Sequence, residues 1–268
     1  MDKRIDIPVL RQRILWTVIM ASIGILFVLS VQRKMEVEVQ KLEVVIKPIK
    51  GKRNLITPGE VKQIFNRHTG YDVTQTAVED IEVKALEALL KADKRIKKVE
   101  VFIDSDNKLN VWIVQRQPIV RVMDGSNRSY YIDEDGDQVP IVEKSAIRVP
   151  LATGHFELYQ EDKFKSDKKG KLKEVFEVSK ALFADEFLSA LVEQIDVSEN
   201  GEIILIPKIG RQEVVLGDAS NLEEKFDNLK IMYKEGLPRE GWRKFNVLKL
   251  NYKGQVVAQK SNETAFIN

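Results

Sequence analysis

Residues 14–31 read ILWTVIMASIGILFVLSV, a run that holds no charged residue and is flanked by basic residues on both sides. An α-helix crosses the roughly 30 Å hydrocarbon core of a bilayer with about 20 apolar residues, so this run is close to the length of a membrane span. Trp16 suits the membrane interface, where an amphipathic indole is favoured. We interpret the run as a retained membrane anchor rather than a buried core helix or a cleaved signal peptide, because no small-residue cleavage site follows it.

The orientation of this anchor follows from the lengths of its flanks. Basic residues lie on both sides of the run, so the positive-inside rule does not decide between the two orientations. Residues 1–13 form a short tail, whereas most of the 268 residues follow the run. We therefore expect the tail to stay in the cytoplasm and everything after residue 31 to be exported.

The composition describes an ordinary globular protein after the anchor, with 43% hydrophobic and 31% charged residues. The 43 basic and 41 acidic residues give a net charge of +2, which offers no support for nucleic-acid binding. The chain has no cysteine, which excludes disulfides, thiol catalysis and cysteine-based zinc sites. Its two histidines, His68 and His155, lie in different segments, which excludes a multi-histidine metal site. We expect no cofactor and no metal.

Residues 35–122 carry the pattern of a small α+β domain. Thr57-Pro58-Gly59-Glu60 combines a cap residue, a proline at the first helical position and a glutamate three residues after the cap, which is typical of a helix start. The periodicity predicts, in order, a strand over 35–49, a helix over 57–70, a helix over 82–92, and strands over 96–103 and 109–114. This β-α-α-β-β order predicts two helices on one face of a three-stranded sheet.

Residues 123–260 are richer in strands, and residues 261–268 are expected to be a flexible tail. Residues 163–173 read as a charged, flexible loop. The expected elements are a hairpin over 128–132 and 138–142, a helix over 172–182 that continues towards Leu191, strands over 192–197, 202–207 and 213–216, a helix over 221–235, and strands over 245–250 and 255–259. These strands are expected to form one sheet beside two helices.

The sequence offers little support for catalysis. The acidic run 133–137 invites a calcium interpretation, but an EF-hand loop needs glycine at its sixth position and glutamate at its twelfth. Gln138 and Lys144 occupy those positions, so a solvated hairpin turn is favoured. No phosphate-binding loop or nucleophile motif occurs. We expect a protein that is not an enzyme, although a carboxylate pair for hydrolysis is invisible without geometry.

The last strand pair is the best candidate for binding a partner. The sheet is expected to be open, and an open sheet has an edge that can recruit an extended segment by strand addition. The chain ends at this pair, and residues 251–258 alternate between polar and apolar side chains. The alternative is an ordinary terminal hairpin that pairs only with its own sheet.

Several stretches, taken in order, resemble the FtsQ/DivIB family of bacterial cell-division proteins. The resemblance covers nearly the whole chain. The stretches are Gln115-Arg116-Gln117-Pro118-Ile119, similar to the family's Q-R-x-P; Tyr131-Ile132-Asp133 with Gly136 and Pro140, similar to its Y-x-D-x-x-G hairpin; and a closing block of Lys225, Leu229, Gly241-Trp242 and Leu250-Asn251-Tyr252-Lys253-Gly254-Gln255-Val256-Val257.

This resemblance implies a POTRA-like domain over 35–122, followed by the family's β-domain over 123–260. It also implies a non-enzymatic scaffold of the divisome, single-pass in the inner membrane with its C-terminal domains in the periplasm. The implied partners are the small coiled-coil proteins FtsB and FtsL and other divisome proteins, through which septal wall synthesis is regulated. In that family FtsB adds to the last strand, beside the final helix. This carries over to Tyr252, Lys253, Gly254, Gln255, Val256 and Val257, and also to Lys225, Leu229, Trp242 and Arg116.

Other interpretations remain open from the sequence. Leu229 and Trp242 are also typical of core residues, and Arg116 is equally suited to positioning a strand. A factor in outer-membrane protein assembly or secretion is one rival function, because POTRA domains occur there too. Such proteins typically carry repeated POTRA units or a barrel, and this chain shows neither pattern. A membrane-anchored envelope hydrolase is the other rival.

Overall fold

The computed structural model describes residues 7–35, 38–51, 53–126, 128–142, 147–166 and 169–260, and within the first helix it describes the side chains of residues 15–30. Residues 1–6 of the expected cytoplasmic tail and the whole expected tail 261–268 lie outside the described residues. The chain divides into two compact units, the first formed by Met1–Lys47 and Ile56–Val114 and the second by Pro48–Leu55 and Gln115–Asn268.

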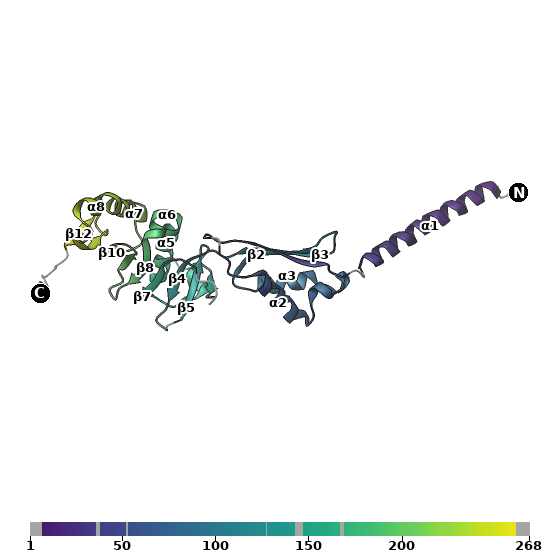
Figure 1. Ribbon diagram of the computed structural model, residues 1–268, viewed down its shortest axis with the longest axis horizontal. Helices are drawn as coiled ribbons and strands as arrows, with labels where there is room; N and C mark the ends of the chain where they lie inside the picture. Colours follow the sequence, from purple (N-terminus) through teal and green to yellow (C-terminus); the bar gives the residue numbers. More distant parts are fainter. Residues whose placement is uncertain are drawn as a thin grey trace. The chain divides into compact units, whose positions relative to one another are not determined.

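Helix α1 (Ile7–Met35) contains the apolar run 14–31, so the predicted helix is present (Figure 1). Its described large apolar side chains, from Leu15 to Leu29, are exposed. Among the described residues, none of the helices combines the length and the apolar character that crossing a bilayer requires. Membrane crossing by this helix therefore stays a prediction.

Helix α2 (Pro58–Thr69) begins and ends at the residues that the sequence indicates. The Glu60 backbone N–H donates to the Thr57 side chain at 3.3 Å, and the Thr57 backbone N–H donates to the Glu60 carboxylate at 2.8 Å. These two bonds form the predicted capping box and satisfy amide groups that have no partner within the helix. Gly70 ends the helix in the left-handed conformation, with φ at 82°.

The first unit has the predicted three-stranded sheet, with strand order β1-β3-β2 and β1 parallel to β3. Figure 1 shows α2 and α3 on one face of this sheet, and Phe65, Leu90 and Val111 belong to the buried core between them. Strand β1 is shorter than the predicted 35–49, and two short 3₁₀ turns were not predicted. The elements are β1 (Lys41–Lys47), η1 (Val73–Gln75), η2 (Val78–Asp80), α3 (Val83–Lys91), β2 (Ile96–Ile103) and β3 (Lys108–Gln115).

The second unit is built on one sheet of nine strands, in the order β12-β11-β10-β9-β8-β7-β4-β5-β6. This confirms the prediction of a single sheet. Two of its strands, β4 and β7, were not predicted, and β4 belongs here rather than to the range 35–122 because it pairs with β5 and β7. The strands are β4 (Pro118–Met123), β5 (Ser129–Asp133), β6 (Gln138–Pro140), β7 (Leu151–Gly154), β8 (Val192–Val197), β9 (Ile203–Pro207), β10 (Glu213–Gly217), β11 (Phe245–Lys249) and β12 (Val257–Lys260).

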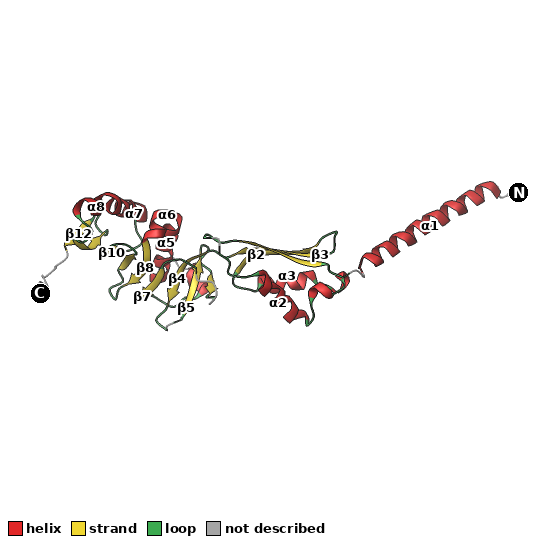
Figure 2. Cartoon of the chain, viewed as in Figure 1, coloured by secondary structure: helices red, strands yellow, loops and turns green. Residues whose placement is uncertain are grey.

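More helices accompany this sheet than the two that were predicted. Figure 2 shows helices beside the strands of this unit in red. The expected flexible loop 163–173 is largely helical in its described part, because Phe164 is buried beside the ring of Phe176. Asp185 breaks the predicted continuation towards Leu191 and caps a separate helix. The helices are α4 (Glu161–Ser166), α5 (Lys171–Ala184), α6 (Glu186–Leu191), α7 (Leu222–Ile231), the π-helical turn η3 (Met232–Gly236) and α8 (Leu237–Glu240).

The segment Pro48–Leu55 belongs to the second unit although it lies between β1 and α2 in the sequence. Ile49 and Leu55 form a small buried cluster with Tyr131 and Val139. The Leu55 backbone N–H also donates to the buried side chain of Gln115. Because these bonds and contacts lie among residues of the second unit, the segment is part of that unit's packing.

The capping box supports a first test of this fold. Replacing Thr57 by alanine removes the acceptor of the Glu60 N–H, so we expect the free energy of unfolding to fall by about 1 kcal/mol. Thr57→Ser keeps the hydroxyl and should stay close to the parent. Urea unfolding followed by far-UV circular dichroism measures the difference. Equal midpoints for the alanine and serine variants would contradict the role of the cap.

Candidate functional site

Strand β12 lies at one edge of the nine-stranded sheet and β6 at the other. It pairs antiparallel with β11, with Leu248 opposite Ala258 and Lys249 opposite Val257. On its other side β12 has no strand partner within the part of the chain that the structure describes. Alternate backbone N–H and C=O groups of an edge strand point away from the sheet, so β12 presents groups that another chain can bind.

Strand β12 begins at Val257, two residues later than the predicted strand over 255–259. The residues Tyr252 to Val256, to which the resemblance carried over strand addition, therefore lie before the strand and not in it. Gly254 adopts the left-handed conformation at φ 71°, which favours a turn over a strand. Its backbone N–H donates to the Glu224 carboxylate at 2.9 Å. Tyr252, Lys253 and Gln255 are exposed, whereas Val256 packs against the core.

Two residues expected to contact a partner are buried instead. Leu229 is a fully buried residue of α7, in the same core cluster as Phe226. Lys225 is also buried, and its ammonium donates to the backbone oxygen of Asp218 at 2.9 Å and to the carboxylate of Asp218 at 2.8 Å. The Lys225 ammonium holds the pKa of Asp218 well below its usual range. Both side chains therefore support the helix beside the edge, and neither is open to a partner.

Trp242 lies between α8 and β11 and is 38% exposed. Its ring packs edge-to-face on Tyr233, with the ring centroids 5.9 Å apart, and its backbone oxygen accepts a bond from Gln212. Trp242 precedes β11 and Tyr252 follows it, so these two residues lie at opposite ends of that strand. A partner that contacts both must run along the length of the edge.

Arg116 has an internal role. Its guanidinium donates to the carboxylate of Asp133 at 2.9 Å and also contacts Asp137. The predicted hairpin turn is present and Asp135 is exposed on it, but Asp133 is fully buried rather than solvated. The other oxygen of Asp133 accepts the backbone N–H groups of Asp135 and Asp137. Burial raises the pKa of Asp133, and the bond from Arg116 opposes that rise. Arg116 thus positions the hairpin of β5 and β6, as one of the two sequence interpretations held.

No group of three or more histidine and carboxylate side chains is placed to hold a metal ion among the described residues. What the described edge offers is a strand with one free side, a turn of exposed polar side chains at its start and a half-buried aromatic ring near its end. This arrangement is suited to binding an extended polypeptide segment.

The buried Arg116–Asp133 pair predicts a pH-dependent loss of stability on substitution. Arg116→Gln leaves the Asp133 carboxylate without its charged partner, so we expect a loss of about 3 kcal/mol at pH 7. The substitution should also raise the pKa of Asp133 further, because Arg116 lowers it in the parent.

A raised pKa in the folded state means that the folded protein holds the proton more tightly than the unfolded chain, so stability falls as the pH rises towards the folded pKa. The difference between Arg116→Gln and the parent should therefore be larger at pH 7 than at pH 4. Urea unfolding of both proteins at pH 7 and at pH 4 measures this difference in the free energy of unfolding. An equal difference at pH 7 and at pH 4 would show that the Asp133 carboxylate is not the group that the substitution affects.

Comparison with known families gives two matches. Residues 117–259 match the family model described as FtsQ/DivIB, C-terminal related. Residues 38–114 match the POTRA-like domain. The first match alone covers more than half of the 268 residues and extends from the segment before β4 into β12. No curated protein shows a significant sequence match to the chain.

Proposed function

Because the chain belongs to the FtsQ/DivIB family, a family of non-enzymatic cell-division scaffolds, we propose that it is a membrane-anchored scaffold of the bacterial divisome that binds its partners at the β12 edge. The proposed partners are FtsB-like and FtsL-like coiled-coil proteins, through which the chain regulates septal wall synthesis. The observation that carries the proposal is the unpaired outer side of β12 among the described residues.

The proposed mechanism is strand addition. A partner segment pairs with the outward backbone groups of β12 and becomes the next strand of the sheet. Backbone hydrogen bonds supply affinity, and side chains that alternate along the added strand supply specificity. Val257 and Ala258 are half-buried, whereas Gln259 and Lys260 are exposed, so the described strand offers both apolar and polar neighbours to a partner.

The opposite edge of the same sheet is less suited to this role. Strand β6 has only three residues, Gln138–Pro140. It ends in a proline, which has no backbone N–H to donate. Short strands and prolines are devices that protect an edge from pairing. The described β12 ends without a proline, which supports it as the edge that binds.

The turn before β12 adds side-chain contacts to this mechanism. Tyr252 is 47% exposed and lies at the entrance to the strand with Lys253. The bond between the Gly254 N–H and Glu224 ties this turn to α7 and holds it beside the start of the edge. These observations support contacts of Tyr252 and Lys253 with the partner residues that flank the added strand.

A pair of neighbouring proline variants tests strand addition. In an antiparallel ladder the backbone groups of successive residues point to opposite sides, so Ala258 and Gln259 donate in opposite directions. We expect one of Ala258→Pro and Gln259→Pro to lose capture of FtsB-like and FtsL-like proteins by at least tenfold while the core stays folded. Co-purification with the full-length chain, followed by mass spectrometry, measures capture.

Circular dichroism of both variants is the folding control. Each variant should also be tested for rescue of division in cells depleted of the chain, where the variant that loses capture should leave filamentous cells. If both proline variants fold and capture the division proteins undiminished, strand addition at β12 is excluded.

The anchor is the second part of the proposal and rests on the apolar run 14–31. We expect the full-length chain to stay in the membrane pellet after extraction at alkaline pH, because apolar burial in the bilayer resists it. A chain without residues 1–31 should be recovered in the supernatant. Release of the full-length chain under the same conditions would contradict the anchor.

A further inference from the structure

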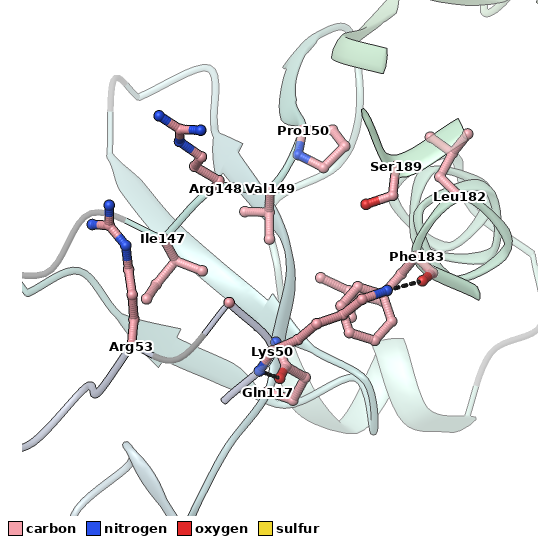
Figure 3. A pocket seen from close by; sticks show the side chains of 12 residues that line it. Lys50, Arg53, Gln117, Ile147, Arg148, Val149, Pro150, Leu182, Phe183 and Ser189 are labelled. Atoms are coloured by element: carbon pink, nitrogen blue, oxygen red, sulfur yellow. Dashed lines mark hydrogen bonds between the residues drawn. The ribbon is translucent and has the colours of Figure 1, made fainter. Parts of the chain in front are cut away.

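A cavity of about 430 Å³ lies within the second unit, and Figure 3 shows the side chains that line it. Its walls come from the segment Pro48–Leu55, the start of β4, residues 147–150 and the region where α5 gives way to α6. Strand β4 is six positions from β12 in the sheet, which corresponds to roughly 30 Å at about 4.8 Å per strand. The cavity is therefore separate from the proposed partner edge.

The lining of this cavity, called here the basic pocket, combines an apolar surface with charge of one sign. Its charged lining residues are Lys50, Arg53 and Arg148, and no carboxylate lines it among the described residues. A cavity of similar size near Tyr252 is lined by both signs, with Asp218 and Lys225 among its residues. The chain as a whole is nearly neutral. The excess of positive charge at this pocket is therefore local and does not reflect the overall composition. Its apolar lining residues are Ile119, Ile147, Val149, Pro150, Leu182 and Phe183.

Lys50 is held in place by three contacts. Its ammonium donates to the backbone oxygen of Phe183 at 3.0 Å and lies 4.4 Å from the centre of the Phe183 ring. Its backbone N–H donates to the side chain of Gln117 at 2.7 Å. Figure 3 shows the Lys50 side chain extended across the pocket towards Phe183. An ammonium has three N–H donors, and the bond to Phe183 uses one of them. Lys50 is therefore held in position while further N–H groups can bind a ligand.

Arg148 and Arg53 lie on the other side of the pocket, with Ile147 between them in the view of Figure 3. Arg148 is exposed, and no hydrogen bond or ion pair joins its guanidinium to another described residue. A guanidinium binds a carboxylate through two parallel hydrogen bonds, which a lysine cannot reproduce. The pocket therefore offers a carboxylate binder directly beside an apolar surface.

We propose that the basic pocket binds an acidic segment of a partner protein that also carries apolar side chains. A carboxylate of the segment pairs with Arg148, and a neighbouring apolar side chain packs on Val149 and Leu182. Charge complementarity selects the acidic residues, because every charged side chain that lines the pocket is basic in the part of the chain that the structure describes. The volume and the apolar lining favour a peptide over a small inorganic anion, which would leave most of the pocket unfilled.

This proposal does not depend on strand addition at β12, because none of the described residues that line the pocket belongs to β11 or β12. It gives the second unit a second binding surface of different chemistry. The edge offers backbone groups to a strand, whereas the basic pocket offers cationic side chains to acidic residues.

The test measures binding of the fluorescein-labelled peptide Glu-Leu-Glu-Leu-Glu to the full-length chain in a non-ionic detergent, by fluorescence anisotropy at low salt. We expect saturable binding that weakens at least tenfold in Arg148→Glu and severalfold in Arg148→Gln. The matched control is Arg243→Glu, which makes the same charge change at an exposed residue outside the pocket. Its affinity should stay within twofold of the parent.

Two further peptides separate the contribution of apolar packing from that of charge. The peptide Glu-Ser-Glu-Ser-Glu should bind at least fivefold more weakly, because it cannot fill the apolar part of the pocket, and Lys-Leu-Lys-Leu-Lys should not bind. Equal losses in Arg148→Glu and Arg243→Glu would overturn the proposal by showing general attraction only. It would also be overturned if the serine peptide bound as well as the leucine peptide, or if the Glu-Leu peptide did not bind. Circular dichroism confirms the fold of each variant.

Discussion

A strand inside a sheet has its backbone groups paired on both sides, and only an edge strand keeps groups that another chain can bind. In the second unit this constraint leaves β12 and β6 as the described strands with a free side. Burial of the neighbouring strand fixes the position of β12, because Leu248 of β11 belongs to the core and lies opposite Ala258. The edge is thus a consequence of packing behind it, and its geometry does not depend on a partner.

Some residues around the β12 edge stabilise its surroundings, and others are exposed to solvent beside it. Leu229 and Lys225 hold α7 in place, one by apolar burial and the other by bonding to Asp218. Glu224 of the same helix fixes the turn before β12 through the Gly254 N–H. Tyr252 remains exposed on that turn. Substitutions in the first group would alter partner binding only through the shape of the edge, so effects at such positions are not by themselves signs of direct contact.

The sequence predicted elements well where periodicity and end signals agreed. Thr57 and Gly70 mark both ends of α2, and the predicted ranges 96–103 and 192–197 coincide with β2 and β8. Strand β7 was not predicted, because a four-residue strand between two parallel neighbours carries no alternating pattern. The lysines of 163–173 indicated a loop, and tertiary packing of Phe164 explains the helix there.

Partner binding at the last strand stays a prediction, and the structure tests only the position and the surroundings of that strand. The last strand does lie at an edge, which the order of strands along the chain made plausible. Its start was predicted at residue 255, two residues before β12 begins, because the bond from the Gly254 N–H to Glu224 that holds the preceding turn is not visible in a local pattern. The role of Arg116 depended on Asp133, a residue whose burial no local pattern reveals. The basic pocket was missed because its walls come from segments far apart in the sequence.

Hydrogen–deuterium exchange of the full-length chain, alone and co-purified with the proposed FtsB-like and FtsL-like partners, tests the central claim most directly. If the partner adds a strand to the free side of β12, the amides of Val257–Lys260 should gain strong protection in the complex, while those of Gln138–Pro140 in β6 should not change. Unchanged exchange at β12, with new protection confined to β6 or to the edge strand β2 of the first unit, would contradict the account.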